Sequence, residues 1–273
     1  MSPYDLTNLA ALKAWLGLPA GASANDAALN ALVSAASRAI YAALSRPGLL
    51  PQSYCELRDG DRRTLVLRHW PVLQVNTVTW NGISVPQVAA GRLDAAFGYA
   101  LRPGDLAPPG APQALDLFGV WPSHRRANVV VDYQAGYAVL GETQSVPAAA
   151  PRQATAFAPY GPWASDLGVV YAENGLPLAA VEGAPAAGQY AVADGVYSFA
   201  AADAGAAVSL SYGYVPQDLA QAALELAAER FRAAEHIGLR SKSLGGQETI
   251  AFDASAISAP VMALIQPYRR VAV

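Results

Sequence analysis

The chain has 273 residues, of which 53% are apolar and 14% are charged, against a usual charged share of about 25%. Its net charge of −3 excludes a general field that would hold nucleic acid or an anionic membrane. Lys13 and Lys242 are the two lysines beside many arginines, a bias that fits surfaces meeting partners. A codon bias toward Ala, Gly, Pro and Arg explains the same composition, so both interpretations stay open.

Cys55 is the single cysteine, which excludes an internal disulfide and a thiolate metal cage. We expect it to be a buried, inert thiol. The N-terminus does not place a cationic start before an apolar run, so we expect no signal peptide. No apolar stretch reaches membrane-spanning length. These features predict a soluble protein of the cytoplasm, or of a particle assembled there.

Two helices are predicted at the start of the chain. Residues 5–17 repeat leucine every three or four positions and stop at Gly17. The second helix has Ser23 as its cap, Asp26 as an acidic capping-box partner, and Pro47-Gly48 at its end. Its apolar stripe is Leu29, Leu32, Val33, Ala36, Ile40 and Leu44. The short polar joint predicts an antiparallel helical hairpin.

The pattern changes to a period of two at Tyr54. Asn81-Gly82 is a two-residue hairpin signal between apolar strands. Residues 86–128 are weakly patterned and predict short strands and loops, and residues 129–133 predict a strand that ends at Gly136. The phrase VVVDYQAGYAV that ends this strand leads into no helical pattern.

The second half begins with a stretch typical of a linker, from Val139 to about Ala164. A second β region follows, with hairpins expected at Asn174-Gly175 and Asp194-Gly195. Its last strand, AVSLSYGYV, meets Pro216 and turns into a helix predicted over 217–236. A short final helix starts at Pro260 and ends at Pro267.

The strand ending before the Pro216 helix repeats the ending at Gly136-Tyr137. Without residues 140–215, VVVDYQAGYAV would run directly into PQDLAQAALEL. We therefore interpret this stretch as a β module inserted at a surface loop, where few contacts cross. One continuous β-rich domain with two similar strands is the alternative.

The two ends of the chain resemble the head-to-tail connector, or adaptor, family of tailed bacteriophages and prophages. The resemblance covers about two thirds of the chain. It is carried by the order of several phrases: the N-terminal helix pair, LxLxHxPVxxVxxVxxNG from Leu65 to Gly82, VVVDYQAGY, VPQDLAQAALELAAERF, SKSLGGQETIAF and MALIQPYRRV. Residues 140–213 depart from the family pattern and are similar to small β modules of other phage structural proteins.

The resemblance implies an α+β fold, a small helical bundle with a β-hairpin arm, plus an inserted all-β module. The domains would be 1–139 with 214–273 as a discontinuous adaptor core, and 140–213 as the insert. The family forms rings, here expected to be dodecameric, at the head–tail junction of the virion, assembled in the host cytoplasm. Such a ring docks on the portal protein, extends the DNA channel without sequence-specific binding, and offers a surface to a downstream neck or tail protein. The family is not enzymatic.

Two sets of residues are candidates for these contacts. A ring subunit needs two different faces, and the 217–236 helix is proposed as the ring interface through Leu219, Glu225, Glu229 and Arg232. The C-terminal tail is the candidate for gripping the portal or a neighbouring subunit, with an alternating strand that could pair with a sheet edge and a tyrosine and two arginines typical of interface hot spots. Its members are Ile250, Phe252, Met262, Leu264, Ile265, Tyr268, Arg269 and Arg270.

Chemistry-bearing motifs are missing from the sequence. His69, His124 and His236 lack metal spacing, and the chain carries no phosphate-binding loop or nucleophile elbow. We therefore expect no catalytic, cofactor or metal residues, no cofactor and no membrane partner.

Two alternatives stay open. In the first, the β module binds glycan or a tail or decoration partner through Tyr160, Trp163, Tyr171, Tyr190 and Tyr197. In the second, the chain is a hydrolase without a recognisable motif.

Overall fold

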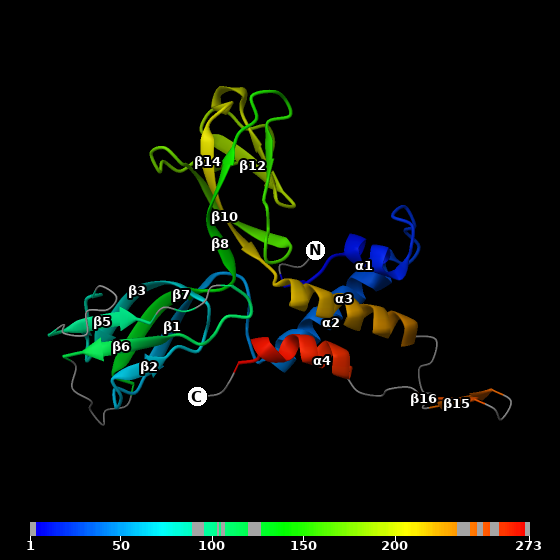
Figure 1. Cartoon of the computed structure of the whole chain (residues 1–273), viewed down its shortest axis with the longest axis horizontal. Coiled ribbons are helices and arrows are strands. Elements are labelled where there is room, and N and C mark those ends of the chain that lie inside the picture. Colours follow the sequence, from blue (N-terminus) through cyan, green and yellow to red (C-terminus); the bar gives the residue numbers. More distant parts are fainter. Residues whose placement is uncertain are drawn as a thin grey trace. The chain divides into compact units, whose positions relative to one another are not determined.

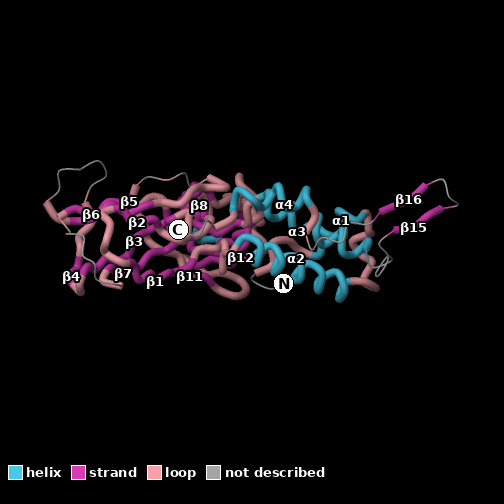
Figure 2. Tube along the Cα trace, turned by 90° about the horizontal axis from the view of Figure 1, so that it is seen from below, coloured by secondary structure: helices cyan, strands magenta, loops and turns pink. Residues whose placement is uncertain are grey.

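The computed structural model of the chain is described at residues 4–88, 96–102, 104, 107–119, 127–233, 241–244, 248–251 and 257–270. Figure 1 traces the chain from blue to red. The chain divides into two compact units: Met1–Gly48 with Gln217–Arg270, and Leu49–Pro216. Figure 2 shows the helices in the first unit, together with the β15–β16 hairpin. All other described strands belong to the second unit.

The helical unit is built from both ends of the chain. Its helices are α1 (Leu9–Leu16), α2 (Asp26–Leu44), α3 (Gln217–Ala233) and α4 (Ala259–Ile265), with a 3₁₀ turn η3 (Gln266–Tyr268). Helix α3 packs against α1, α2 and α4. A hairpin of β15 (Ser241–Leu244) and β16 (Glu248–Ala251) lies between α3 and α4 in sequence.

The ends of α1 follow from local chemistry. Asn8 caps its start, because its side-chain oxygen accepts a hydrogen bond from the Ala11 N–H at 2.8 Å. Gly17 ends it in the left-handed conformation, with φ of 70°. The helix is therefore shorter at its start than the predicted 5–17.

The predicted capping box of α2 is wrong. The helix begins at Asp26, and Asn25 precedes it without a side-chain capping bond. The Asp26 carboxylate instead lies 2.6 Å from the Lys13 ammonium, whose side chain is only 7% exposed. Asp26 therefore fastens α2 to α1, a tertiary contact that a local sequence pattern does not reveal.

By length and composition, α2 could cross a membrane, with 19 residues and a mean hydropathy of 1.3. The expectation that no apolar stretch reaches this length is therefore wrong by that criterion. A soluble core helix passes the same test, and α2 packs against α3 within the unit. Its stripe of Leu29, Val33, Ala36, Ile40 and Leu44 is almost fully buried.

The second unit begins with a β-sandwich of two antiparallel sheets. One has the order β1 (Gln52–Arg58), β7 (Val129–Ala135), β3 (Val72–Trp80), β4 (Ile83–Ser84), and the other β2 (Thr64–Val66), β6 (Ala114–Phe118), β5 (Gly98–Leu101). Alternate residues of both sheets form one core, including Val78, Leu115, Leu117, Val131 and Tyr133. The predicted Asn81-Gly82 hairpin is confirmed between β3 and β4, with φ of 50° and 80° at its two turn residues.

A second β-sandwich follows with its own core. One sheet has the order β10 (Trp163–Tyr171), β14 (Ala207–Tyr214), β8 (Ala138–Ser145), and the other β11 (Ala179–Ala180), β12 (Gln189–Ala193), β13 (Val196–Phe199), β9 (Gln153–Thr155). A 3₁₀ turn, η1 (Ala201–Asp203), precedes β14. The core comes from residues between Val146 and Tyr212, among them Tyr190, Tyr197 and Leu210.

The hairpin and linker predictions in this region meet different outcomes. The Asp194-Gly195 hairpin is confirmed between β12 and β13, with φ of 48° and 80°. At Asn174-Gly175 the chain does turn back, since the Tyr171 N–H donates to Leu176 O at 2.9 Å. The returning segment, however, becomes β11 and pairs in parallel with β12. The linker predicted over 139–164 is wrong, because β8 and β9 lie there.

The predicted fold class is wrong. Strands outnumber helices in the described residues, and four α-helices form only the smaller unit, so the chain is mostly β and not a small helical bundle with a hairpin arm. The sheets β1-β7-β3-β4 and β2-β6-β5 build a sandwich with its own core, which is more than a hairpin arm. The short strands predicted within 86–128 are confirmed as β5 and β6, which complete the second sheet.

The two similar strand endings meet within the second unit. Gly136 and Gly213 both lie against Leu50-Pro51: a Cβ on Gly136 would be 2.5 Å from the Leu50 carbonyl carbon, and one on Gly213 would be 3.1 Å from Pro51 Cδ. The following residues, Tyr137 and Tyr214, are fully buried with ring centroids 5.9 Å apart, and the Tyr214 N–H donates to Tyr137 O.

The repeated glycine–tyrosine phrase therefore marks two strands that pack against the same segment. The insertion at 140–213, with 1–139 and 214–273 as one domain, stays a prediction.

Candidate interaction surfaces

The C-terminal candidates fall into two groups in the structure. Ile265 and Tyr268 are 1% exposed and belong to the core of the helical unit. Met262 is 40% exposed and Arg269 is exposed, so these two face solvent. Leu264 and Arg270 are half-buried, and the Arg270 N–H donates to Leu44 O at 2.9 Å.

Two side-chain hydrogen bonds bring this segment onto α3. The Tyr268 hydroxyl donates to Asp218 Oδ2 at 2.9 Å, near the start of α3. The Ser258 hydroxyl donates to Glu229 Oε1 at 2.8 Å, near its end. The two candidate sets are therefore neighbours on one helix pair, with the C-terminal segment running back along α3.

The ring-interface candidates on α3 are partly taken up by the chain itself. Leu219 is fully buried, and Glu225 accepts a hydrogen bond from Gln221 at 2.8 Å. Glu229 and Arg232 are exposed. Most alanines of α3 are buried within the chain itself: Ala220, Ala222, Ala223, Ala227 and Ala228.

The hairpin candidates are only partly covered. Ile250 lies in β16, where it pairs with Lys242 of β15. Phe252 lies outside the described residues. Their role stays a prediction.

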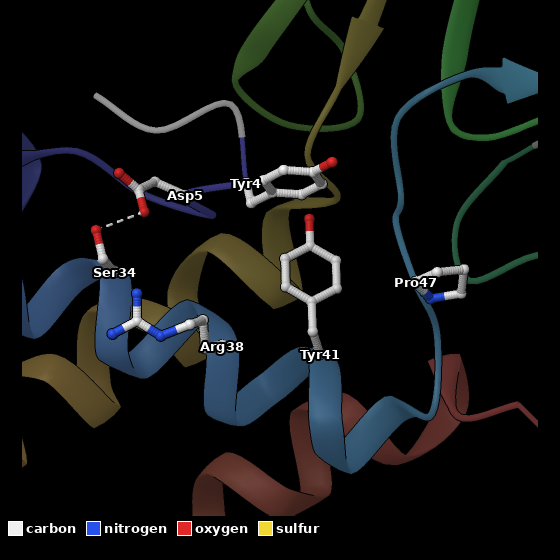
Figure 3. A pocket seen from close by; sticks show the side chains of 6 residues that line it. All are labelled: Tyr4, Asp5, Ser34, Arg38, Tyr41 and Pro47. Carbon is white, nitrogen blue, oxygen red and sulfur yellow. Dashed lines mark hydrogen bonds between the residues drawn. The ribbon is translucent and has the colours of Figure 1, made fainter.

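A hollow of about 360 Å³ lies beside the outer face of α2. Figure 3 shows its lining: Tyr4 and Asp5 from the N-terminal segment, Ser34, Arg38 and Tyr41 from α2, and Pro47. The Ser34 hydroxyl donates to Asp5 Oδ1 at 2.9 Å, and the Tyr4 and Tyr41 rings meet edge to face with centroids 6.4 Å apart.

Sequence reasoning missed this hollow. The signal was present, since Ser34, Arg38 and Tyr41 recur at four and three residues along α2 and so share one polar-aromatic face. The hollow joins a guanidinium to two aromatic rings, residue types that suit protein contacts.

A buried carboxylate, Glu56, organises one end of the first sandwich. It is 6% exposed and accepts hydrogen bonds from the Tyr133 hydroxyl and from the Arg68 N–H at 2.9 Å. Its other oxygen lies 3.7 Å from Arg58 Nη1 and 4.0 Å from Arg68 Nε. The His69 N–H donates to the Tyr133 hydroxyl at 3.2 Å. Burial, and then the hydrogen bond to Glu56, raise the pKa of Tyr133 well above its usual range.

The second sandwich repeats this pairing of tyrosine with carboxylate. Tyr190 and Tyr197 donate to Asp166, and Tyr212 donates to Glu142. Burial is the main cause that raises the pKa of all three tyrosines. We refer to Tyr133, Tyr190, Tyr197 and Tyr212 as the buried tyrosines. Because a buried hydroxyl needs a hydrogen-bond partner, these pairs are elements of the cores.

These contacts bear on the aromatic residues considered for glycan binding. Tyr190 and Tyr197 are at most 2% exposed. Trp163 and Tyr171 pack against the same core, and Tyr171 also donates to Asp203 at 2.6 Å. Of the five, Tyr160 alone reaches the surface substantially, with 43% exposed. The five side chains therefore do not form one exposed aromatic face.

The expectation that Cys55 is buried is wrong, because its thiol is exposed on the outer face of β1. The strand alternates, so Glu56 points to the core and Cys55 away from it. A hydrogen bond with Asp132 is the main cause that raises the pKa of the Cys55 thiol. A raised pKa lowers the thiolate fraction, which makes the thiol a poor nucleophile at neutral pH.

No arrangement for metal binding is found within the described part of the chain, where no three His, Cys, Asp or Glu side chains gather. The His69 ring stacks on Tyr54 with centroids 3.7 Å apart, while His124 and His236 lie outside the described residues. These observations assign no catalytic role to any described side chain.

Comparison with known proteins adds no relative. No protein-family model matches the chain, and a search of curated proteins returns no significant match.

Proposed function

We propose that the protein is a structural neck component of a tailed phage or prophage, forming a ring between the portal and the tail. The observation that carries the proposal is the order of the connector-like phrases along both ends of the chain. Helices α1 and α2 come from the first of these ends, and α3 and α4 from the last. Residues 1–48 and 217–270 pack together in one unit, while the connector-like phrases at 65–82 and 129–137 lie in the other.

The surface chemistry supports a contact role. Met262 and Arg269 present an apolar and a cationic side chain on the solvent side of the C-terminal segment. Residue types of this kind are enriched in protein interfaces. In this function the second unit, with its two sandwiches, projects a surface toward the next neck or tail component, and DNA passes through the ring without sequence-specific contacts.

The burial of the C-terminal residues decides which variant can test the proposal. Deleting residues 260–273 removes Ile265 and Tyr268, which are core residues, so a loss of assembly after this deletion would report unfolding. The double variant Met262→Glu with Arg269→Glu changes only side chains that face solvent. We expect it to lose binding to portal particles of its own virus in co-sedimentation, with an unchanged circular dichroism spectrum and melting temperature.

The matched control is Arg62→Glu, a charge reversal at an exposed turn of the first sandwich. It should bind portal as the unchanged protein does. Undiminished portal binding by the Met262/Arg269 variant would show that the C-terminal segment does not form the portal contact. If the unchanged protein is folded and binds no portal at all, the proposed function is wrong.

A further inference from the structure

Strand β1 forms a long, regular edge of its sheet, and its inward-pointing charge, Glu56, lies beside the guanidinium groups of Arg58 and Arg68. Sheet edges are normally shortened, bulged or interrupted, because their unpaired N–H and C=O groups attract other strands. Strand β1 pairs with β7 over seven consecutive residues, Gln52–Arg58, without a register shift. It has no lysine and no proline within it.

The other edge strands of the two sandwiches differ from β1 in this respect. Strands β4 and β11 have two residues, β2 and β9 have three, and β5 has four. Strand β10 is broken by two register shifts, and β8 pairs with β14 across one. Among the described edges, β1 therefore combines length with a regular backbone.

Nearby chain contacts β1 through side chains. The segment 66–69 begins at the last residue of β2. It is held by the Arg58 guanidinium, which donates to Val66 O at 3.0 Å, and by Glu56, which accepts from the Arg68 N–H. The outer face of β1 is open: Ser53 and Cys55 are exposed, and Leu57 is 58% exposed.

The sequence of β1 is complementary to itself. An antiparallel pair of β1 strands that uses all seven residues has its two-fold axis at the central residue, Cys55. Glu56 then lies opposite Tyr54 of the partner subunit, and Arg58 opposite Gln52 of the partner subunit, so no like charges face each other. A two-fold axis one residue later would oppose two Glu56 carboxylates.

We propose that two copies of this chain associate through antiparallel pairing of their β1 edges, centred on Cys55, which joins two four-stranded sheets into one. Such a contact is isologous, because the same strand serves both copies. It is distinct from the heterologous ring contact of the proposed function and does not rest on that function.

The Cys55 thiol can report on this contact through disulfide formation. In the proposed register the two Cys55 residues are directly opposite, with Cα atoms about 4.5–5.5 Å apart, within the range that a disulfide bridges. Mild oxidation of the purified full-length protein at alkaline pH, where more of the Cys55 thiol is ionised, should give a disulfide-linked dimer on a non-reducing gel.

The control separates pairing from random collision. In the variant Cys55→Ser with Leu57→Cys, the single thiol is on the same exposed face, but the two thiol positions are offset by four residues, about 13 Å along the strand. This variant should give far less dimer than the unchanged protein. Equal yields of disulfide-linked dimer from both proteins would overturn the proposal. The absence of dimer from the unchanged protein would overturn it as well.

A second measurement avoids oxidation. The double variant Ser53→Lys with Leu57→Lys places lysine opposite lysine twice in the dimer, at positions that face solvent in the single chain. In sedimentation velocity under reducing conditions, it should weaken self-association roughly tenfold. Ser53→Glu with Leu57→Lys should restore it. If both variants dimerise as strongly as the unchanged protein, the β1 edge is not the contact.

Discussion

Replacing Tyr133 by phenylalanine tests whether the Glu56 cluster stabilises the first sandwich. The change removes one hydroxyl, which donates to the Glu56 carboxylate and accepts from the His69 N–H. It keeps the ring, which is fully buried in the sandwich core.

The expected loss follows from the state in which Glu56 is left. A hydrogen bond to a charged group contributes about 1.5–3 kcal/mol to stability. Without Tyr133, the carboxylate keeps the Arg68 N–H at 2.9 Å and two guanidinium groups at 3.7 and 4.0 Å. We therefore expect Tyr133→Phe to lower the free energy of unfolding of the second unit by about 2 kcal/mol. For a unit of this size that corresponds to a fall in melting temperature of about 4–8 °C.

The assay is urea unfolding followed by circular dichroism, with Tyr54→Phe as the matched control. Tyr54 lies beside Tyr133, with ring centroids 5.7 Å apart, but its hydroxyl bonds to Gln52 on the exposed side. The control should cost less than about 0.5 kcal/mol. An equal loss for both variants would contradict the assigned role of the Glu56–Tyr133 bond, as would no loss from Tyr133→Phe.

Three further outcomes follow from the structure. Gly136→Ala should lower the free energy of unfolding by about 3 kcal/mol or more, because the new Cβ would meet the Leu50–Pro51 backbone at a φ of 150°. Gly21→Ala, with open space around it, should leave the free energy of unfolding nearly unchanged in the same denaturation assay. The buried tyrosines should stay protonated at about pH 11, where ordinary tyrosines ionise: their folded pKa values are raised, so their stabilising effect persists below the ordinary pKa and is lost as pH rises through the folded value. Tyrosinate absorbance that shows every tyrosine titrating together in folded protein would contradict this. Asp116→Asn should lower the free energy of unfolding slightly at neutral pH, because the hydrogen bond from Arg102 lowers the Asp116 pKa. The difference in stability between the variant and the unchanged protein should vanish as pH falls through that lowered pKa. A difference in stability that persists in acid would contradict the assignment.

Local signals in the sequence predicted local structure well. Asn81-Gly82 and Asp194-Gly195 form the expected turns, because positive φ at both positions is a property of the residues themselves. The helix after Pro216 begins where it was expected, at Gln217. The strand 129–133 is the core of β7.

The amount of β structure could not be predicted in this way. Strands β8 and β9 lie in sequence that predicted a linker, and the positions of β5 and β6 within 86–128 were not predicted. Strands β6, β8 and β9 are held by partners far away in the chain. Strand β6, for example, pairs with β2 about fifty residues earlier. Tertiary pairing here overrides the weak local propensity.

The candidate contact residues show the same limit. The spacing along α3 and the C-terminal segment identified a related group, since the two pack together through Tyr268–Asp218 and Ser258–Glu229. It could not separate Ile265, which fills the core, from Met262, which faces solvent. A helix exposes or buries a residue according to which helices surround it, and α3 is contacted by three.

The central claim is that copies of this chain form a ring on a phage portal. Electron microscopy of the purified protein, alone and mixed with portal particles of its own virus, tests this most directly. We predict a closed ring of subunits, coaxial with the portal and attached to its tail-facing side. Portal particles that stay bare, beside a protein that forms no ring, would contradict it.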